Sequence, residues 1–211
     1  EGMLLRMDSR ETWSPLIGQH NAYNLLAIYT TAVVLGADEE ETLIALSSLR
    51  PAPGRLENLR GPKDISVIID YAHTPDALEN VLKTLREIAT DRELICLFGC
   101  GGDRDKSKRP EMAQIAQKLA DRIIVTSDNS RTEKTSDIMA DIKAGMDISG
   151  RAKSLFIEDR EEAIRTAIMI AGQGATILLA GKGHETYQII GTEKRHFDEK
   201  EIVSEIFKQM N

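Results

Sequence analysis

The sequence has little of what nucleic-acid-binding and membrane proteins are built from. Aromatic residues make up 4% of the 211 residues, so platforms on which bases could stack are not expected. The formal net charge of −7 provides no overall positive field, which argues against nucleic acid as the main partner. No apolar run approaches the roughly 18 residues that a membrane-spanning helix needs, and residues 1–3 do not have the layout of a signal peptide. We therefore expect a soluble globular protein without a membrane partner.

Cysteine is also scarce. Cys96 and Cys100 are too few for a disulfide scaffold, so we expect free thiols in a reducing cytoplasm. Their spacing lacks a second ligand pair, and a metal site is therefore not expected. A hydrophobic content of 41% at 29% charged residues excludes a disordered polymer. The length suits one large domain, or a small domain followed by one of about 150 residues.

The first part of the chain predicts two helices. Apolar residues recur at helical spacing over residues 21–35, and a second helix is expected at residues 38–49, with three glutamates in its first turn. The break at Pro51-Ala52-Pro53-Gly54 is the best candidate for a domain boundary. Residues 1–7 resemble the end of a strand whose partners are missing, and the first twenty residues are otherwise expected to be irregular. This favours a chain that is part of a longer protein.

Beyond the break, strand and helix patterns alternate. Strands are expected at residues 66–70, 94–98, 122–126, 154–157 and 175–180. Helices are expected at residues 75–89, 110–120, 135–146, 160–171 and 198–210. This order predicts an α/β fold, with a mainly parallel sheet covered by helices on both faces. Residues 187–190 and 195–197 predict a hairpin across Gly191 that would place an antiparallel strand at one edge of the sheet.

Charged residues collect where four of these strands end. Ligands bind open α/β sheets beyond the carboxyl ends of the strands, so the loops that follow are the candidate site. They are residues 70–74, 99–106, 127–131 and 180–185. Loops are polar by default, but four charged loops at one edge favour a binding site over that simpler explanation.

Familiar catalytic motifs do not fit these loops. The segment 99–109 lacks the second glycine of GxxxxGK[ST], and Arg104 occupies the last glycine position of GxGxxG. The segment that begins at His184 lacks the second histidine of HExxH, and no serine or cysteine lies in a nucleophile elbow. A self-contained hydrolase or dehydrogenase is therefore poorly supported, and we predict no catalytic residue in this chain.

The remaining charges suit a small molecule with several charged ends. Arg104 and Arg131 can each grip a carboxylate through two parallel hydrogen bonds, and Asp128 and Glu185 can receive an ammonium group. Two cations facing two acids complement an amino acid with more than one charged end. The alternative is that these four groups pair among themselves as surface salt bridges of little energetic value.

Several ordered motifs are similar to the second half of a Mur ligase. They are GQHNAYN at residues 18–24, PGRLE at 53–57, DYAHTP at 70–75, FGCGGDRD at 98–105, DNSR at 128–131 and AGKGHE at 180–185. The similarity runs from about Leu16 to the end of the chain. Within the Mur ligase family, the motifs resemble the synthetases that add the third residue of the peptidoglycan stem peptide.

The resemblance implies a function for the complete protein and a place for this chain within it. Residues 1–50 would be the end of a central ATP-binding domain, and residues 51–211 would be a Rossmann-like, amino-acid-binding domain. The complete enzyme would use ATP and Mg²⁺, both mainly bound by an upstream region, to join meso-diaminopimelate to UDP-N-acetylmuramoyl-dipeptide. The family's phosphate-binding loop is not in this sequence, so this chain alone is expected to be inactive. We expect a cytoplasmic monomer.

The resemblance also implies site residues. The nucleotide would be bound by Asn21, Asn24, Arg55, Asp70 and His73, with Asp70 accepting hydrogen bonds from ribose hydroxyls. The amino acid would be bound by Arg104, Asp128, Asn129, Ser130, Arg131, Gly181 and Glu185. Asn21 and Asn24 are one helical turn apart, so their amides can face one ligand. Asn21 and His73 could instead serve as local helix caps.

One position departs from the family pattern. Members that add meso-diaminopimelate usually read Asp-Asn-Pro-Arg, and Ser130 stands here in place of the proline. Loss of that fixed φ angle leaves the loop freer but keeps the arginine. A lysine-adding synthetase therefore stays as an alternative. Two further alternatives, independent of this position, are a related amide ligase such as a folylpolyglutamate synthetase and a stand-alone nucleotide-binding module.

Overall fold

The chain divides into two compact units. A computed structural model describes residues 2–210, and the units are residues 1–52 and 53–211. In the first unit, strands β1 (Met3–Met7) and β2 (Arg10–Ser14) form an antiparallel hairpin. Helices α1 (Gln19–Val34) and α2 (Glu39–Ser47) follow, and Asp38 caps α2 by accepting from two backbone N–H groups. The small core of this unit includes Leu25, Tyr29 and Leu46.

The start of this unit corrects the sequence-based expectation. Residues 1–20 were expected to be irregular, with an unpaired strand, but Met3–Met7 pairs along its whole length with Arg10–Ser14. The turn between them is formed by Asp8 and Ser9, both at positive φ. Two-residue hairpin turns need positive φ, which glycine and asparagine supply most often. An Asp-Ser turn therefore gave no clear hairpin pattern in the sequence.

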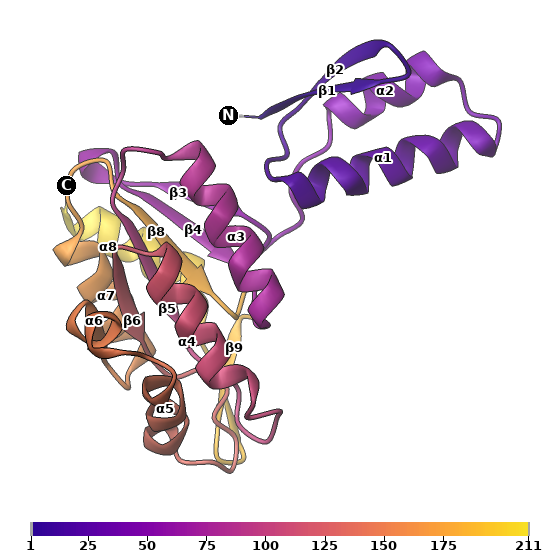
Figure 1. Ribbon diagram of the computed structural model, residues 1–211. Coiled ribbons are helices and arrows are strands. Elements are labelled where there is room, and N and C mark those ends of the chain that lie inside the picture. Colours follow the sequence, from indigo (N-terminus) through magenta and orange to yellow (C-terminus); the bar gives the residue numbers. More distant parts are fainter. Residues whose placement is uncertain (1, 211) are drawn as a thin grey trace. The chain divides into compact units, whose positions relative to one another are not determined.

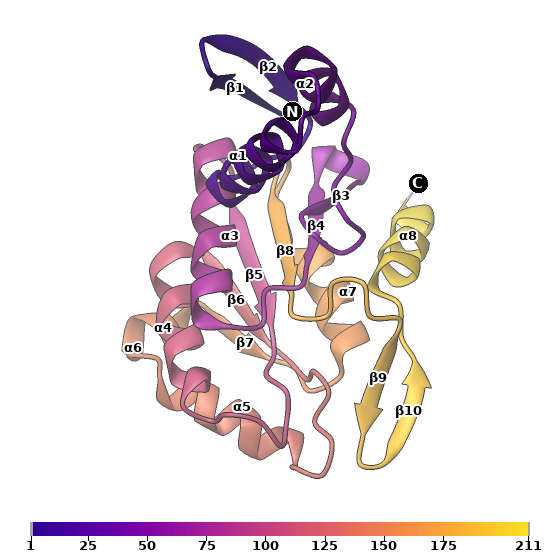
Figure 2. The ribbon, with the colours of Figure 1, turned by 90° about the vertical axis from the view of Figure 1, so that its right-hand side faces the viewer.

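The second unit is built on a six-stranded sheet of order β3-β4-β8-β5-β6-β7 (Figures 1 and 2). Its strands are β3 (Glu57–Arg60), β4 (Ser66–Asp70), β5 (Leu94–Phe98), β6 (Arg122–Val125), β7 (Ser154–Phe156) and β8 (Thr176–Ala180). Every neighbouring pair from β4 to β7 is parallel, and β3 runs antiparallel to β4. The predicted α/β fold with a mainly parallel sheet is confirmed.

Helices cover both faces of this sheet, as predicted. They are α3 (Pro75–Ile88), α4 (Lys108–Leu119), α5 (Thr135–Ala144), α6 (Ile148–Ala152), α7 (Arg160–Ile170) and α8 (Glu199–Met210), and a short 3-10 turn, η1, spans Pro62–Asp64. Figure 2 shows α3 and α4 on one side of the sheet and α7 and α8 on the other. Alternate strand residues such as Val67, Leu97 and Leu179 pack with α7 and α8 into one apolar cluster.

Two details of the sheet differ from the prediction. The hairpin β9 (Tyr187–Ile190) and β10 (Glu193–His196) is not an edge of the main sheet but forms a two-stranded sheet of its own (Figure 2). The antiparallel edge strand is β3 instead. Its sequence, Glu-Asn-Leu-Arg, is half-buried and too polar to be recognised as a strand. Within residues 2–210, no helix is long and apolar enough to cross a membrane.

A buried ion pair joins α7 to α8 beneath the ends of two strands. Arg160, with a side-chain exposure of 0%, donates from Nε to Glu199 Oε1 at 2.8 Å. Its two other nitrogens donate to the carbonyl oxygens of Ser127 and Ala180, which follow β6 and end β8. Burial raises the pKa of Glu199, while the guanidinium opposes that shift. One side chain thus holds α8 and two strand ends together.

We predict that Arg160→Met lowers the free energy of unfolding of the second unit by about 3–5 kcal/mol, because it leaves the Glu199 carboxylate buried without a partner. Urea unfolding followed by circular dichroism measures this value. The matched control is Arg165→Met on the same helix, whose ion pair with Glu161 is largely exposed and should be worth less than about 1 kcal/mol. Equal losses in the two variants would contradict the assignment.

Candidate functional site

A pocket of about 390 Å³ lies at the carboxyl ends of strands β4, β5, β6 and β8. The loops after these strands converge there because parallel strands all end at the same edge of their sheet. The pocket is lined by Tyr71, His73, Thr74, Gly99, Cys100, Gly101, Arg104, Asp105, Lys108, Asp128, Asn129, Arg131, Gly181 and Glu185. All four loops chosen from the sequence contribute residues to it.

Six of the seven residues expected to hold an amino acid line this pocket. They are Arg104, Asp128, Asn129, Arg131, Gly181 and Glu185. The seventh, Ser130, is 1% exposed and is not among the residues that line the pocket. His73, expected near the nucleotide, also lines the pocket, whereas Arg55 and Asp70 do not.

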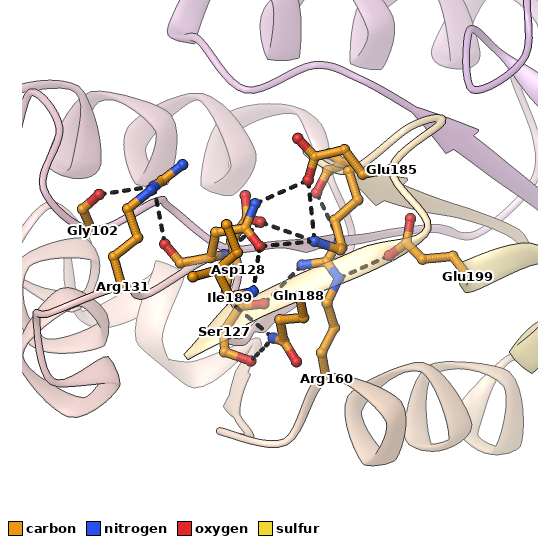
Figure 3. A network of polar contacts seen from close by, with 12 residues as sticks. Gly102, Ser127, Asp128, Arg131, Arg160, Glu185, Gln188, Ile189 and Glu199 are labelled. Atoms are coloured by element: carbon orange, nitrogen blue, oxygen red, sulfur yellow. Dashed lines mark hydrogen bonds and ion pairs between the residues drawn. The ribbon is translucent and has the colours of Figure 1, made fainter. Parts of the chain in front are cut away.

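The two arginines do not pair with acids in the part of the chain that is described. Arg131 donates from Nη1 to the carbonyl oxygens of Gly102 and Asn129, at 2.9 and 3.2 Å (Figure 3). Arg104 is exposed and reaches only the carbonyl oxygen of Asp103, at 3.4 Å. The salt-bridge alternative is therefore wrong for these two side chains. Both positive charges are available to a ligand carboxylate.

The two acids contact a lysine that sequence reasoning did not select. Lys182 is fully buried, and its Nζ lies 3.5 Å from Asp128 Oδ1 and 3.3 Å from Glu185 Oε2. It also donates to Asn129 Oδ1 at 3.3 Å. The pattern that could have indicated this role is its place between two glycines in AGKGHE, which does not distinguish a buried lysine from an exposed one.

The hairpin β9–β10 fixes the loop that carries Asp128 to Arg131. Asn129 Oδ1 accepts from the backbone N–H of Ile189 at 2.9 Å, and its Nδ2 donates to Glu185 at 2.9 Å. Gln188 is buried and donates to Ser127 Oγ and to the carbonyl oxygen of Asp128. Arg131 forms a parallel bridge with Ile190. The hairpin thus acts as a short strand partner for the binding loop.

A second buried arginine joins the glycine-rich loop (residues 99–106) to the segment that follows the binding loop (residues 127–131). Arg109, 0% exposed, makes a paired contact with Glu133 at 2.9 and 3.1 Å and an ion pair with Asp141 at 2.8 Å. Glu133 also accepts from the backbone N–H of Asp103 at 2.7 Å. These contacts, Arg109 first, lower the pKa of Glu133 from 4.5 to about 2.

Two small residues of the pocket lining, Gly181 and Cys100, affect the space beside Asp128 and the reactivity of the lining. Gly181 has φ +118°, and a Cβ atom there would lie 3.2 Å from Asp128 Oδ2, so glycine keeps that oxygen open. Burial raises the pKa of the Cys100 thiol to about 12. Cys100 and Cys96 are both free, as expected, and the structure shows that both are buried. Cys100 is thus a thiol rather than a nucleophilic thiolate.

Asp70 is a structural anchor at the end of β4. It is 4% exposed, and its two carboxylate oxygens accept from the backbone N–H groups of Leu56 and Ala72, each at 2.8 Å. The bond to Leu56 fixes the loop that carries Arg55. The guanidinium of Arg55 lies over the ring of Tyr71, 5.1 Å from its centre.

His73 and Tyr71 form a small aromatic group at the pocket. Their ring centres are 4.7 Å apart, and His73 Nδ1 contacts the carbonyl oxygen of Tyr71 at 2.8 Å. Thr74, not His73, caps α3 by accepting from the backbone N–H of Ala77. His73 is therefore not the cap of that helix.

Asn21 and Asn24 lie in the first unit, near the start of α1. Asn21 donates from Nδ2 to the carbonyl oxygen of Ile17 at 2.8 Å, and Asn24 donates to Asn21 Oδ1 at 3.4 Å. The residue at the N-cap position is Gly18. The two amides are neighbours on one side of the helix, as their spacing predicted.

Comparison with known proteins identifies the family. Residues 54–183 match the family described as "Mur ligase, glutamate ligase domain". The chain belongs to the Mur ligase family. It is 51% identical over 208 residues to the UDP-N-acetylmuramoyl-L-alanyl-D-glutamate–2,6-diaminopimelate ligase of Bacteroides thetaiotaomicron, covering 98% of this chain and 43% of that protein. The Trichormus variabilis protein of the same name is 53% identical over 190 residues, 89% of this chain and 38% of that protein.

A solved Mur ligase structure with that same name superposes with a TM-score of 0.73 at 40% identity, covering 99% of this chain and 43% of that one. This chain therefore spans less than half the length of the Mur ligases it matches. The family match ends at residue 183, before the hairpin β9–β10 that holds the binding loop.

We predict that the bond between Arg109 and Glu133 makes stability depend on acid pH. A carboxyl group whose pKa is lowered on folding stabilises the folded state above its ordinary value, and that stability is lost as the pH falls from 4.5 towards 2. Glu133→Gln should therefore flatten this part of the profile. Urea midpoints measured from pH 6 to pH 2 test this, with Glu111→Gln on the exposed side of α4 as the control. Parallel profiles for wild type and Glu133→Gln would contradict it.

Proposed function

We propose that this chain is the carboxyl-terminal, amino-acid-binding part of an ATP-dependent ligase. The ligase adds meso-diaminopimelate to UDP-N-acetylmuramoyl-L-alanyl-D-glutamate during peptidoglycan synthesis. The observation that carries this proposal is the pocket at the sheet edge, which is lined by two carboxylates and by two arginines that have no acidic partner among residues 2–210. The relatives named as 2,6-diaminopimelate ligases support the same substrate.

The charge pattern matches an amino acid with charges at both ends. Arg131 and Arg104 would each bind a carboxylate, and Asp128 and Glu185 would bind an ammonium group. Asn129 and Gly181 would shape the pocket around the bound molecule. Ser130 lies behind this lining, so its replacement of the family's proline leaves the surface that meets the ligand unchanged.

The nucleotide would meet a different set of residues. We assign it Asn21 and Asn24 in the first unit, which would be the end of the central ATP-binding domain. In the second unit we assign it Arg55, Asp70 and His73. Asp70 would act chiefly by holding the Arg55 loop in place, since both of its oxygens already accept backbone N–H groups. ATP and Mg²⁺ would be held mainly by a region outside this chain.

The chemistry of the complete ligase would use this chain to place the nucleophile. The γ-phosphoryl group of ATP passes to the side-chain carboxylate of the dipeptide substrate. The neutral amine of the amino acid then attacks the acyl carbon, phosphate leaves, and the nitrogen loses a proton. The residues of this pocket would orient the amine and help to exclude water from the acyl phosphate. We place the protein in the cytoplasm as a monomer.

We predict that the complete ligase prefers meso-diaminopimelate to lysine and that Arg131→Ala removes much of this preference. Lysine has no second carboxylate and would leave Arg131 desolvated without a partner. Loss of a charged hydrogen bond should reduce the ratio of the two kcat/KM values by about 10- to 100-fold. Steady-state kinetics with both amino acids measure it. Arg151→Ala, outside the pocket, is the control, and a wild-type preference for lysine would contradict the substrate assignment.

We also predict that the 211-residue chain alone neither hydrolyses ATP nor forms an amide. It has no GxxxxGK[ST] sequence to hold the phosphates. Phosphate release from ATP, measured with the purified chain and both other substrates, should equal that of buffer. Turnover above this background, after contaminating full-length enzyme is excluded, would contradict the division of roles.

A further inference from the structure

Lys182 is the best-connected charge at the pocket, yet the proposed roles do not include it. Its Nζ has three oxygen neighbours, which are Asp128 Oδ1 at 3.5 Å and Asn129 Oδ1 and Glu185 Oε2 at 3.3 Å. Among the described residues, two of these contacts are hydrogen bonds, to Asn129 and Glu185, and the third is an ion pair with Asp128. The side chain is fully buried and does not line the pocket. Lys182 is therefore not placed to bind a ligand directly.

Two aromatic rings also lie near this ammonium group. The ring centres of Tyr187 and Phe197 lie 5.7 and 5.9 Å from Nζ, within the range of cation–π attraction. Tyr187 belongs to β9 and Phe197 follows β10, so the hairpin closes this side of the ammonium group. A buried cation enclosed in this way is stable only while its oxygen partners stay in place.

Lys182 contacts one oxygen of the Asp128 carboxylate and one oxygen of the Glu185 carboxylate, and the second oxygen of each has no contact with it. Glu185 Oε2 accepts from both Lys182 and Asn129, while no described residue donates to Oε1. Asp128 Oδ1 faces Lys182 and accepts from the backbone N–H of Asn129, while Oδ2 lies beside Gly181 without a donor in residues 2–210. Both carboxylates line the pocket. Each one is thus held by one oxygen and has the other available.

We infer that Lys182 is a positioning residue for ammonium recognition, through its simultaneous contact with Asp128, Asn129 and Glu185. It draws one oxygen of each carboxylate inward and so orients the two remaining oxygens toward a ligand ammonium group. It also cancels one of the two negative charges, which matches the site to one bound ammonium rather than two. The hydrogen bond from Lys182 to Asn129 Oδ1 orients the Asn129 amide so that its Nδ2 faces Glu185. This inference deepens the proposed function and rests on it.

The test is Lys182→Met in the complete ligase, with KM values for ATP and for meso-diaminopimelate measured separately. Removing one partner of a buried charge pair should raise the KM for the amino acid about 30-fold or more. The KM for ATP should change less than about 3-fold. The matched control is Lys83→Met, which removes an exposed lysine paired with Glu79 and should change neither KM.

The split between the two constants separates positioning from simple support of the fold. If Lys182 served only stability, Lys182→Met would lower the fraction of active enzyme, and kcat would fall with both KM values unchanged. That result would overturn the inference and leave the proposed function standing. A wild-type enzyme without amino-acid-dependent amide formation would instead overturn the proposed function.

A double variant keeps the inference testable if Lys182→Met does not fold. Lys182→Met with Glu185→Gln removes one charge of each sign, so that Asp128 is the one carboxylate that loses its lysine partner. Because Lys182 acts through Glu185, the two substitutions should not be additive, and the double variant should raise the amino-acid KM by less than the product of the rises in the two single variants. If Lys182→Met alone does not fold, the double variant is compared with Glu185→Gln, and the two KM values should be close. A double variant whose KM rises by a further 30-fold over Glu185→Gln would contradict the inference.

Discussion

A buried positive charge must be surrounded by oxygen atoms, and this constraint arranges the whole binding edge of the second unit. Arg109, Arg160 and Lys182 are each 0% exposed, and each joins segments that are distant in the sequence. Arg109 ties the glycine-rich loop to Glu133, Arg160 ties two strand ends to α8, and Lys182 ties the binding loop to Glu185. Because an unpaired buried charge is costly, the loops have few other arrangements open to them.

The charges at the pocket surface, unlike these buried cations, are not fully paired within the part of the protein that the structure describes. Within residues 2–210, the hydrogen bonds of Arg104 and Arg131 go to backbone carbonyl oxygens, and one oxygen of Glu185 has no donor. The molecule thus satisfies its buried cations internally and leaves its surface charges for a ligand. In the function we propose, this division would hold the loops in place while the pocket presents charges of both signs to a small molecule.

Much of the fold and most of the site could be predicted from the sequence, for reasons that particular elements show. Strands such as β4 and β5 are buried on both faces and therefore appear as continuous apolar runs. Thr74 and Pro75 mark the start of α3 in the expected way. The strand β3 and the Asp8-Ser9 turn were missed, because a polar edge strand and a turn without glycine resemble ordinary loops.

The sequence by itself determined the alternation of the parallel strands with their helices and the sheet edge where charged loops gather. Those two features follow from local patterning and from the rule that parallel strands end together. The resemblance to Mur ligases added a set of seven residues, of which six line the pocket at that edge. Only the tertiary structure decided that Lys182 is buried, that Ser130 lies behind the pocket and that the hairpin β9–β10 partners the binding loop. A charged or polar residue in a loop has the same sequence pattern whether it faces solvent or a buried partner. Its role depends on which distant segment packs against it, and that is a property of the folded chain alone.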